Sequence, residues 1–173
     1  MNPYKKAITE QMTRLSNDPH AVFIGYNTIC GSRIYGTLQD VDPDKCIETP
    51  VAENLMMGLA IGMSLEGYKP VVCFERHDFM TVAMDAIVNH LDKLPELSGN
   101  KFCLPVVIRA IVGHDKPLDP GSQHKQDYTE LIQRHTDIEV LKVGTPEDAV
   151  AAYDKACRVI KPIFITEYRE LYT

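Results

Sequence analysis

The stretch PVAENLMMGLAIGMSLEGYKPVVCF, residues 50–74, decides the fold that we expect for this chain. Pro50 opens a predicted helix, because a proline at the first helical position loses no hydrogen bond. Residues 51–65 are nearly all apolar or small, which predicts a helix buried on every side. Gly67 ends this helix as a left-handed cap, and residues 70–74 form an apolar run typical of a buried strand.

On both sides of this stretch, short apolar runs alternate with helical patterns. We predict further strands at residues 21–25, 46–49, 104–110, 138–143 and 162–166, and further helices at residues 3–17, 78–94, 126–135 and 146–159. The strands are continuous apolar runs rather than period-two patterns, which indicates a parallel sheet covered by helices on both faces. We therefore expect a single α/β domain over residues 1–173, with ligands bound at the carboxyl ends of its strands.

The composition is that of an ordinary globular protein with a net negative charge. Hydrophobic residues make up 45% of the chain and charged residues 24%, and 18 Lys and Arg stand against 24 Asp and Glu, a net charge of −6. Because the chain has no basic run, the charge argues against nucleic acid and anionic membranes as main partners. No apolar run reaches the roughly 20 residues that span a bilayer, and the first residues lack a signal-peptide core, so we expect a cytoplasmic protein.

The five cysteines, at positions 30, 46, 73, 103 and 157, show no zinc-site or redox spacing. Most of them lie in apolar runs, so we expect free thiols that are buried in a protein of a reducing compartment. The His, Cys and Asp residues form no cluster with the spacing of metal ligands. We therefore predict no metal held by this chain alone.

Residues 48–53, ETPVAE, followed by GLAIG at residues 58–62, resemble the start of the buried helix in the beta subunits of pyruvate and branched-chain 2-oxoacid dehydrogenases. Transketolases and deoxyxylulose phosphate synthases share a related version. In that family the Glu of this motif contacts the aminopyrimidine of thiamine diphosphate and helps the thiazolium carbon to lose its proton. The resemblance assigns this role to Glu53, whose alternative is a first-turn Glu that favours the helix dipole.

Further segments resemble the family in the family's own order, from Val22 to Tyr172. They lie at residues 74–89, 105–109, 123–126, 145–149 and 162–167. The resemblance implies catalytic roles for Glu53 and His124, and cofactor contacts from Val51, Glu53, Glu75 and Phe79. Phe79 would pack on the pyrimidine ring, and His124 would give a proton or a hydrogen bond to the substrate.

Each of these residues also has a simpler interpretation that the sequence leaves open. Phe79 fits a core aromatic at the start of an amphipathic helix, and Glu75 fits a solvated loop charge. His124 fits a surface histidine. His77 and His114 are weaker candidates for the same site.

Two departures from the family pattern concern the rest of the enzyme. The family holds the diphosphate and its Mg²⁺ with a Gly-Asp-Gly motif, and this sequence contains no Gly-Asp-Gly. Dehydrogenase beta subunits continue into a C-terminal transketolase domain, whereas this sequence stops at Thr173. We therefore expect neither a diphosphate-binding domain nor that C-terminal domain here, and we expect the diphosphate and Mg²⁺ on a partner chain that carries Gly-Asp-Gly.

The resemblance predicts the pyrimidine-binding subunit of a two-subunit thiamine diphosphate enzyme that is inactive alone. Its substrate would be a 2-oxoacid that is decarboxylated, or a ketose whose two-carbon unit is transferred, and the loops at residues 26–44 and 112–122 would set its specificity. Gly58 and Gly62, one turn apart in an apolar helix, let another backbone approach and favour self-association, which with the partner would give a heterotetramer. The alternative is a non-catalytic regulatory protein that pairs with a full-length relative.

Overall fold

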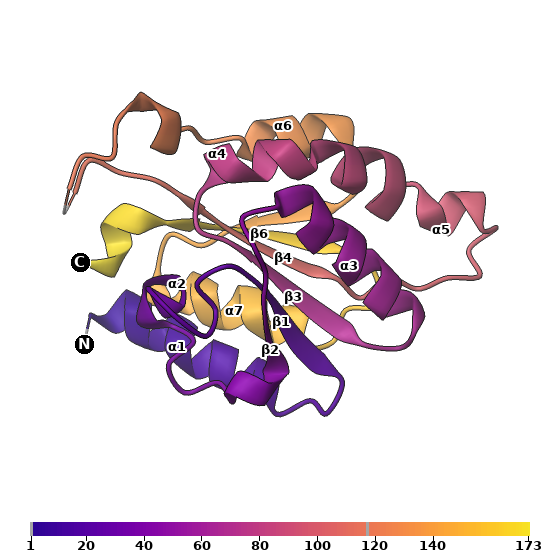
Figure 1. Ribbon diagram of the computed structural model, residues 1–173, viewed down its shortest axis with the longest axis horizontal. Coiled ribbons are helices and arrows are strands. Elements are labelled where there is room, and N and C mark those ends of the chain that lie inside the picture. Colours follow the sequence, from indigo (N-terminus) through magenta and orange to yellow (C-terminus); the bar gives the residue numbers. More distant parts are fainter. Residues whose placement is uncertain (1, 117) are drawn as a thin grey trace.

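The computed structural model describes residues 2–116 and 118–173, and its centre is a six-stranded sheet (Figure 1). The strand order is β2-β1-β3-β4-β6-β5, and every neighbouring pair is parallel. Helices cover both faces of the sheet (Figure 1). The predicted α/β fold, a parallel sheet between two helical layers, is confirmed.

The predicted strands are all present, displaced at their ends by a few residues at most. They are β1 Ala21–Gly25, β2 Cys46–Glu48, β3 Lys69–Phe74, β4 Val107–Val112, β5 Glu139–Lys142 and β6 Ile163–Tyr168. The α-helices are α1 Pro3–Ser16, α2 Arg33–Gly36, α3 Glu53–Leu65, α4 His77–Met80, α5 Leu94–Leu97, α6 Thr129–His135 and α7 Pro146–Ala156. Short segments of 3-10 or π helix lie at Pro43–Lys45, Thr81–Ala83, Ala86–Leu91, Ser122–His124 and Arg169–Tyr172.

Alternate side chains of each strand supply two separate hydrophobic cores. On β3, Val71 and Cys73 belong to the core shared with α1 and α7, whereas Val72 and Phe74 belong to the core shared with α3. Successive side chains of a strand point to opposite faces of its sheet. Burial on both faces therefore requires the continuous apolar runs seen in the sequence.

Capping side chains set the starts of two predicted helices. At α7, Thr145 Oγ1 accepts from the Asp148 N–H at 3.1 Å, and the Asp148 carboxylate accepts from the Thr145 N–H at 3.0 Å. This reciprocal capping box satisfies donors that the helix cannot use internally. At α1, Asn2 Oδ1 accepts from the Tyr4 N–H at 2.8 Å, and Pro3 occupies the first helical position. Local sequence is therefore sufficient to start both helices.

The helix α3 begins at Glu53, later than the predicted start at Pro50. Ala52 precedes it with an extended backbone (φ −153°, ψ 77°), so the first helical turn cannot include Pro50. A proline is common at the first helical position, so the sequence favoured a start at Pro50 and did not reveal the later one. With either start Glu53 lies in the first turn, where free N–H groups favour a negative charge.

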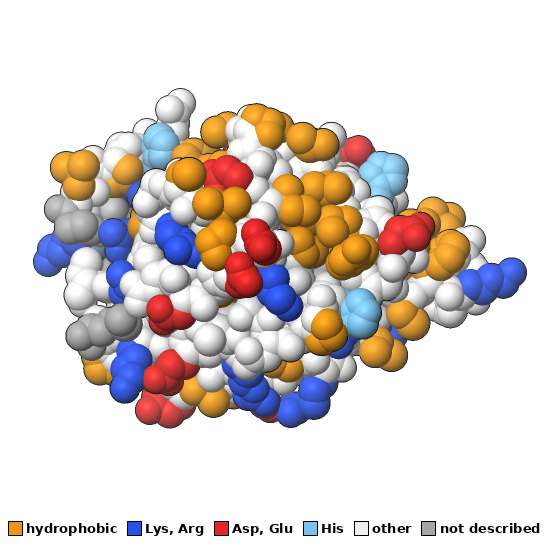
Figure 2. Space-filling view, turned by 60° about the horizontal axis from the view of Figure 1, so that its bottom comes forward, with side chains coloured by type: hydrophobic (Ala, Val, Ile, Leu, Met, Phe, Trp, Pro, Cys, Tyr) orange, Lys and Arg blue, Asp and Glu red, His pale blue; other side chains and the backbone are white. Residues whose placement is uncertain are grey.

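The prediction that α3 is buried on every side is wrong within the chain. Met56 is fully buried against the sheet, whereas Leu55 and Leu65 on the other face are 53% and 41% exposed. A Cβ atom on Gly58 or Gly62 would meet nothing within 4 Å, so no described backbone approaches them. A single sheet covers only one face of a helix, and hydrophobic side chains gather in a patch on the surface of the molecule (Figure 2).

The predicted helix at residues 78–94 is a series of short segments instead. It comprises α4, the 3-10 turn Thr81–Ala83 and the π-helical segment Ala86–Leu91. The Asp92 N–H, for example, donates to the Ile87 carbonyl at 3.0 Å. Each change of hydrogen-bond spacing turns the apolar face, and a periodic apolar pattern does not record such changes.

The burial of the cysteines differs from the expectation. All five are free, as expected, but Cys30 and Cys103 are exposed and Cys157 is partly exposed, whereas Cys46 and Cys73 are buried. Cys30 and Cys103 lie in loops, where no sheet face covers a short apolar run. The expectation of burial is therefore wrong for these two thiols.

Three further observations concern membrane spans, metal-binding groups and the loop at residues 112–122. Among their helices, none combines the length and the apolar character of a membrane span. Within residues 2–116 and 118–173, no three His, Cys, Asp or Glu side chains come together as a group able to hold a metal ion. The predicted specificity loop at residues 112–122 includes Pro117, which lies outside the described residues.

Candidate functional site

The carboxyl ends of three strands bring the predicted site residues to one edge of the sheet. Tyr26 follows β1 directly, Glu75 follows β3 and Gly113 follows β4. The helix α3, which starts with Glu53, packs on β3 and β1. Because parallel strands end at the same edge, the loops that follow them meet there.

Glu53 is a buried carboxylate with a single described side-chain partner. It is 6% exposed, and its Oε1 accepts a hydrogen bond from the Tyr26 hydroxyl at 3.3 Å. Among the described residues, no donor bonds to its second oxygen. Burial, followed by the charge of Glu53, raises the pKa of Tyr26, so the phenol remains a donor. The Glu53 carboxyl therefore has capacity for a further hydrogen bond.

Aromatic side chains connect Glu53 to a hollow in the surface. The Tyr26 and Phe79 ring centroids lie 6.3 Å apart, and the Phe79 ring meets the His124 ring edge-on at 5.3 Å. The hollow has a volume of about 600 Å³ and is lined by Asp78, Phe79, Ser122, Gln123, His124, Gln126 and Tyr128. The structure thus brings Glu53, Phe79 and His124 together, with Tyr26 between them.

His124 is positioned by a close backbone contact with Gly113. A Cβ atom at position 113 would lie 1.6 Å from the His124 carbonyl oxygen, so only glycine fits there. The Nδ1 atom of His124 is buried and has no hydrogen-bond partner among the described residues. Such a nitrogen is one that a ligand or a water molecule would satisfy.

The other two predicted cofactor contacts, Glu75 and Val51, lie differently. The Glu75 carboxylate accepts from the Asn27 side-chain amide at 3.1 Å and from the Ser32 hydroxyl, so it orders the loop after β1. Val51 is 74% exposed in the segment before α3. As cofactor contacts both stay predictions, and Glu75 already has two partners within the chain.

The weaker histidine candidates are not part of this arrangement. The His77 side chain is fully buried, its Nδ1 accepts from the Tyr128 N–H at 3.1 Å, and its ring meets Phe164 edge-on at 5.7 Å. Burial lowers the pKa of His77 to about 4, so the ring is neutral at pH 7. His114 pairs with Glu170 at 3.0 Å near the surface.

A second carboxylate, Glu48, orders the loop after β1, and the sequence pattern did not reveal this role. It accepts backbone N–H bonds from Asn27 at 2.5 Å, Thr28 at 2.8 Å and Ile29 at 2.7 Å, and the Thr28 hydroxyl at 2.9 Å. Burial acts to raise the pKa of Glu48, but these donors together hold it below its ordinary value. The loop that carries Tyr26 is therefore anchored at its base.

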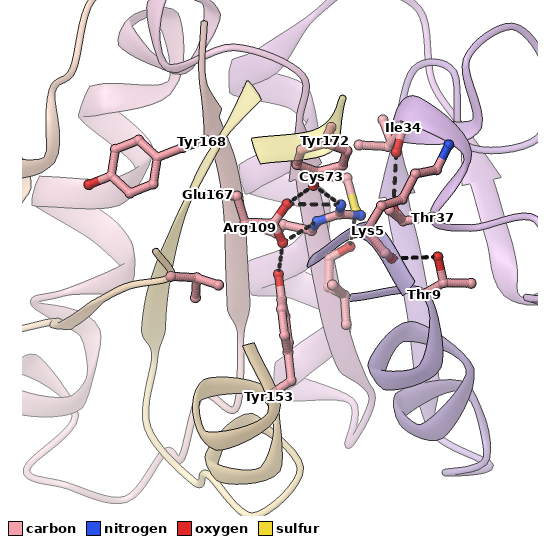
Figure 3. A network of polar contacts seen from close by, with 12 residues as sticks. Lys5, Thr9, Ile34, Thr37, Cys73, Arg109, Tyr153, Glu167, Tyr168 and Tyr172 are labelled. Carbon is pink, nitrogen blue, oxygen red and sulfur yellow. Dashed lines mark hydrogen bonds and ion pairs between the residues drawn. The ribbon is translucent and has the colours of Figure 1, made fainter. Parts of the chain in front are cut away.

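On the α7 side of the sheet, a fully buried ion pair joins β4 to β6 (Figure 3). Arg109 Nε and Nη2 donate to the two Glu167 oxygens at 2.9 and 3.0 Å. The hydroxyls of Tyr153 and Tyr172 donate to the same carboxylate (Figure 3). Burial and the Glu167 charge raise the pKa of both tyrosines well above its ordinary value, so both remain donors. The network connects α7 and the C-terminal turn to the sheet.

Comparison with known proteins identifies the family to which this chain belongs. A family model described as "Transketolase, pyrimidine binding domain" matches residues 2–173. The chain belongs to the transketolase pyrimidine-binding domain family. The resemblance first seen at residues 48–53 is therefore confirmed over nearly the whole chain.

Curated relatives of this pyrimidine-binding domain are longer beta subunits. The acetoin:2,6-dichlorophenolindophenol oxidoreductase subunit beta of Cupriavidus necator is 30% identical, over 96% of this chain and 52% of that protein. The pyruvate dehydrogenase E1 component subunit beta of Bacillus subtilis is 27% identical, over 96% of this chain and 52% of that protein. The chain thus spans about half the length of the curated relatives it matches.

A solved structure shares the fold of this pyrimidine-binding domain. It is described as "Split gene transketolase, inactive beta4 tetramer" and matches with a TM-score of 0.75 and 20% sequence identity. The match covers 96% of this chain and 51% of that chain. At this identity the likeness shows the fold alone, a transketolase-like α/β domain.

Proposed function

We propose that this chain is the pyrimidine-side subunit of a two-subunit thiamine diphosphate enzyme, in which Glu53 contacts the aminopyrimidine. The observation that carries the proposal is the position of Glu53, a 6% exposed carboxylate in the first turn of α3 beside Tyr26. Family membership supports the cofactor class. The beta subunits of pyruvate dehydrogenase and acetoin oxidoreductase among the relatives support decarboxylation of a 2-oxoacid, or transfer of the resulting acyl or ketol unit.

The residues present fit an aminopyrimidine. Glu53 offers a carboxyl oxygen without a partner among the described residues, and Phe79 offers a ring at the edge of the hollow. A ring nitrogen needs such a carboxyl, and the ring face needs such an aromatic surface. Thiamine diphosphate, when bound, supplies the carbanion chemistry of its thiazolium carbon. Glu53 would hold the proton shared with the ring nitrogen, and the Tyr26 hydroxyl would keep the carboxyl oriented.

His124 is the second residue to which we give a catalytic role. Its ring stands edge-on to Phe79 at 5.3 Å, at the border of the hollow, and its buried Nδ1 has no partner among the described residues. An imidazole in this position can give or accept a proton at a substrate bound in the hollow. The contact with Gly113 would keep it there.

The rest of the enzyme would come from other chains. The diphosphate and its Mg²⁺ would lie on a partner subunit with Gly-Asp-Gly, a motif that this sequence does not contain, and the chain alone would be inactive. The exposed face of α3, with Leu55 and Leu65, would pack on a second copy of this chain and give a heterotetramer. The beta-subunit names of the relatives and the tetramer named for the solved structure support such an assembly.

Glu53→Gln tests the proposal in the enzyme reconstituted with its diphosphate-binding partner. The amide keeps the size of the side chain and an acceptor for Tyr26, but it cannot hold and release a proton. Turnover should therefore fall at least about 100-fold, with an unchanged circular dichroism spectrum. Glu66→Gln, at the exposed far end of the same helix, is the matched control. Near-normal turnover of Glu53→Gln would contradict the assignment and favour a non-catalytic regulatory role.

A further inference from the structure

The seven arginines of the chain divide into two groups by their partners. Four of them pair with carboxylates: Arg14 and Arg158 with Asp154, Arg109 with Glu167, and Arg134 with Glu130. Among the described residues, Arg33, Arg76 and Arg169 have no carboxylate within ion-pair distance. The net charge of the chain is −6, so carboxylates outnumber cations. A shortage of carboxylates therefore does not explain the three arginines without a carboxylate partner.

The unpaired arginines gather around one aromatic ring at the carboxyl edge of the sheet. The Arg169 guanidinium carbon lies 4.3 Å from the centroid of the Tyr35 ring, and that of Arg76 lies 5.5 Å from it. Arg76 follows β3, Arg169 follows β6, and Tyr35 comes from the loop after β1. The ring attracts each cation, but it leaves both positive charges and most of their N–H donors without an anionic partner.

The segment α2, Arg33–Gly36, holds Tyr35 there as a left-handed turn rather than as a regular α-helix. Arg33, Ile34, Tyr35 and Gly36 all have left-handed φ angles, of 44°, 40°, 55° and 75°. For a β-branched residue such as Ile34 this is a rare conformation, and it persists only where the surroundings impose it. Here the Ile34 N–H donates to the Asn27 carbonyl at 2.9 Å.

Arg33, the third unpaired arginine, acts inside the loop rather than at its surface. Its Nη2 donates to the carbonyls of Leu38 at 2.7 Å and Val41 at 3.0 Å. Among the described arginines, this leaves Arg76 and Arg169 as the two whose side-chain donors have no hydrogen-bond acceptor. The nearest acidic neighbours in sequence are occupied elsewhere, Glu75 by Asn27 and Ser32, and Glu170 by His114.

Arg76 lies behind His124, beside the backbone contact between Gly113 and His124, and is not itself part of the lining of the hollow. A Cβ atom at position 113 would lie 3.0 Å from Arg76 Nη1 and 1.6 Å from the His124 carbonyl oxygen, so the guanidinium and the His124 backbone flank the same point. Nη1 itself is buried without a hydrogen-bond partner among the described residues. A chain of contacts thus joins Phe79 to His124, the His124 backbone to Arg76 beside Gly113, and Arg76 to Arg169 through the Tyr35 ring.

We infer that Arg76 and Arg169 form an anion subsite for the far end of the substrate, which would be a 2-oxoacid with a second acidic group. This inference rests on the proposed function, because the reacting carbon would lie in the hollow at His124. Two guanidinium groups match the charge and the acceptor oxygens of a distal carboxylate, sulfonate or phosphate. The diphosphate of the cofactor is not the occupant, because the proposal places it on the partner subunit.

The first experiment measures anion binding to the full chain without cofactor or partner. Malonate, a dicarboxylate, is titrated against chloride at equal ionic strength, and the arginine Nε–Hε resonances are followed by NMR. We expect saturable shifts of Arg76 and Arg169, with affinity reduced about 10- to 100-fold in Arg76→Gln, as for the loss of a charge-assisted hydrogen bond. Arg134→Gln, at an exposed ion pair, should bind malonate as the parent does. Equal shifts with chloride, or equal malonate affinity in Arg76→Gln, would overturn the subsite.

The second experiment separates the subsite from the proposed function. In the reconstituted enzyme, Arg76→Gln should raise KM for 2-oxoglutarate about 10-fold or more and leave KM for 2-oxobutyrate, which has no distal charge, nearly unchanged. An equal change for both acids would overturn the distal role. Glu53→Gln should bind malonate as the parent chain does, so a failure of the cofactor assignment leaves the anion result standing.

Discussion

Arg109 lies within β4, whereas Arg76 and Arg169 lie beyond the carboxyl ends of β3 and β6, and the two places differ in what neutralises the arginines. Arg109 is fully buried and donates to Glu167, with the hydroxyls of Tyr153 and Tyr172 bonded to the same carboxylate (Figure 3). At the rim, Arg76 and Arg169 flank Tyr35 without a described anion. Inside the protein, the chain itself must supply the counter-charge, because water cannot. At the rim a ligand can supply it, so the unpaired charges point to binding and the paired one to structure.

The largest effect in this comparison should come from breaking the buried pair. Arg109→Met leaves the Glu167 carboxylate buried without its cation, so the free energy of unfolding should fall by about 3–5 kcal/mol. Arg134→Met, which breaks an exposed pair with Glu130, should cost less than about 1 kcal/mol. Urea denaturation of both variants measures the difference. A loss for Arg109→Met no larger than that of the control would show that the buried pair is not a structural element.

The next effect concerns His77, another buried group, and depends on pH. Its folded pKa of about 4 lies below the ordinary value of 6.5, so the unfolded chain takes up a proton that the folded chain refuses. Stability should therefore be complete above about pH 6.5 and fall by roughly 1–3 kcal/mol as the pH drops towards 4.

Denaturation curves of His77→Gln between pH 4 and 7 test this effect. The variant should lose much of the fall in stability over this range, whereas His90→Gln, a change at an exposed ring, should keep it. An identical pH dependence in the parent and in His77→Gln would show that the buried ring does not carry the effect.

The smallest effect on stability should come from the rim, at Gly113. In Gly113→Ala the new methyl group displaces the His124 carbonyl, and the exposed loop can move aside, so the loss should be about 1–2 kcal/mol. Turnover of the reconstituted enzyme should fall more than stability implies, because His124 moves with its loop. Gly99→Ala, at an open loop position, is the control, although its positive φ of 64° adds some strain. Turnover that stays at the parent level would show that the contact with Gly113 does not position His124.

The comparison also explains which parts of the fold the sequence could predict. Strand positions followed from apolar runs, because burial on both faces of the sheet leaves no polar position to interrupt them. The start of α3 and the π-helical segment Ala86–Leu91 did not, since neither a later helix start nor a change of hydrogen-bond spacing alters the pattern of apolar residues. The partner of Arg109 was also out of reach, because β4 and β6 pair only in the folded sheet.

For the candidate site, the residues that belong to a family motif could be predicted from the sequence. The residues that only contact them in the folded chain could not. Glu53, Phe79 and His124 were predicted from the family resemblance, and the structure brings them to one edge. Tyr26 carried a visible signal, a tyrosine directly after an apolar strand, but its contact with Glu53 spans a strand and a loop. Gly113 carried none, because its close approach to His124 exists only in the folded chain.

The central claim is that this chain supplies the pyrimidine side of a shared thiamine diphosphate site through Glu53. Native mass spectrometry of the tagged chain, isolated from its own cell extract with and without the Glu53→Gln substitution, tests it most directly. The account predicts a complex with a chain that carries Gly-Asp-Gly, containing thiamine diphosphate and Mg²⁺, and the same complex with weaker cofactor retention in the variant. A chain found alone or only with itself, without cofactor even after thiamine diphosphate is added, would contradict the account and leave Glu53 as a residue that starts a helix.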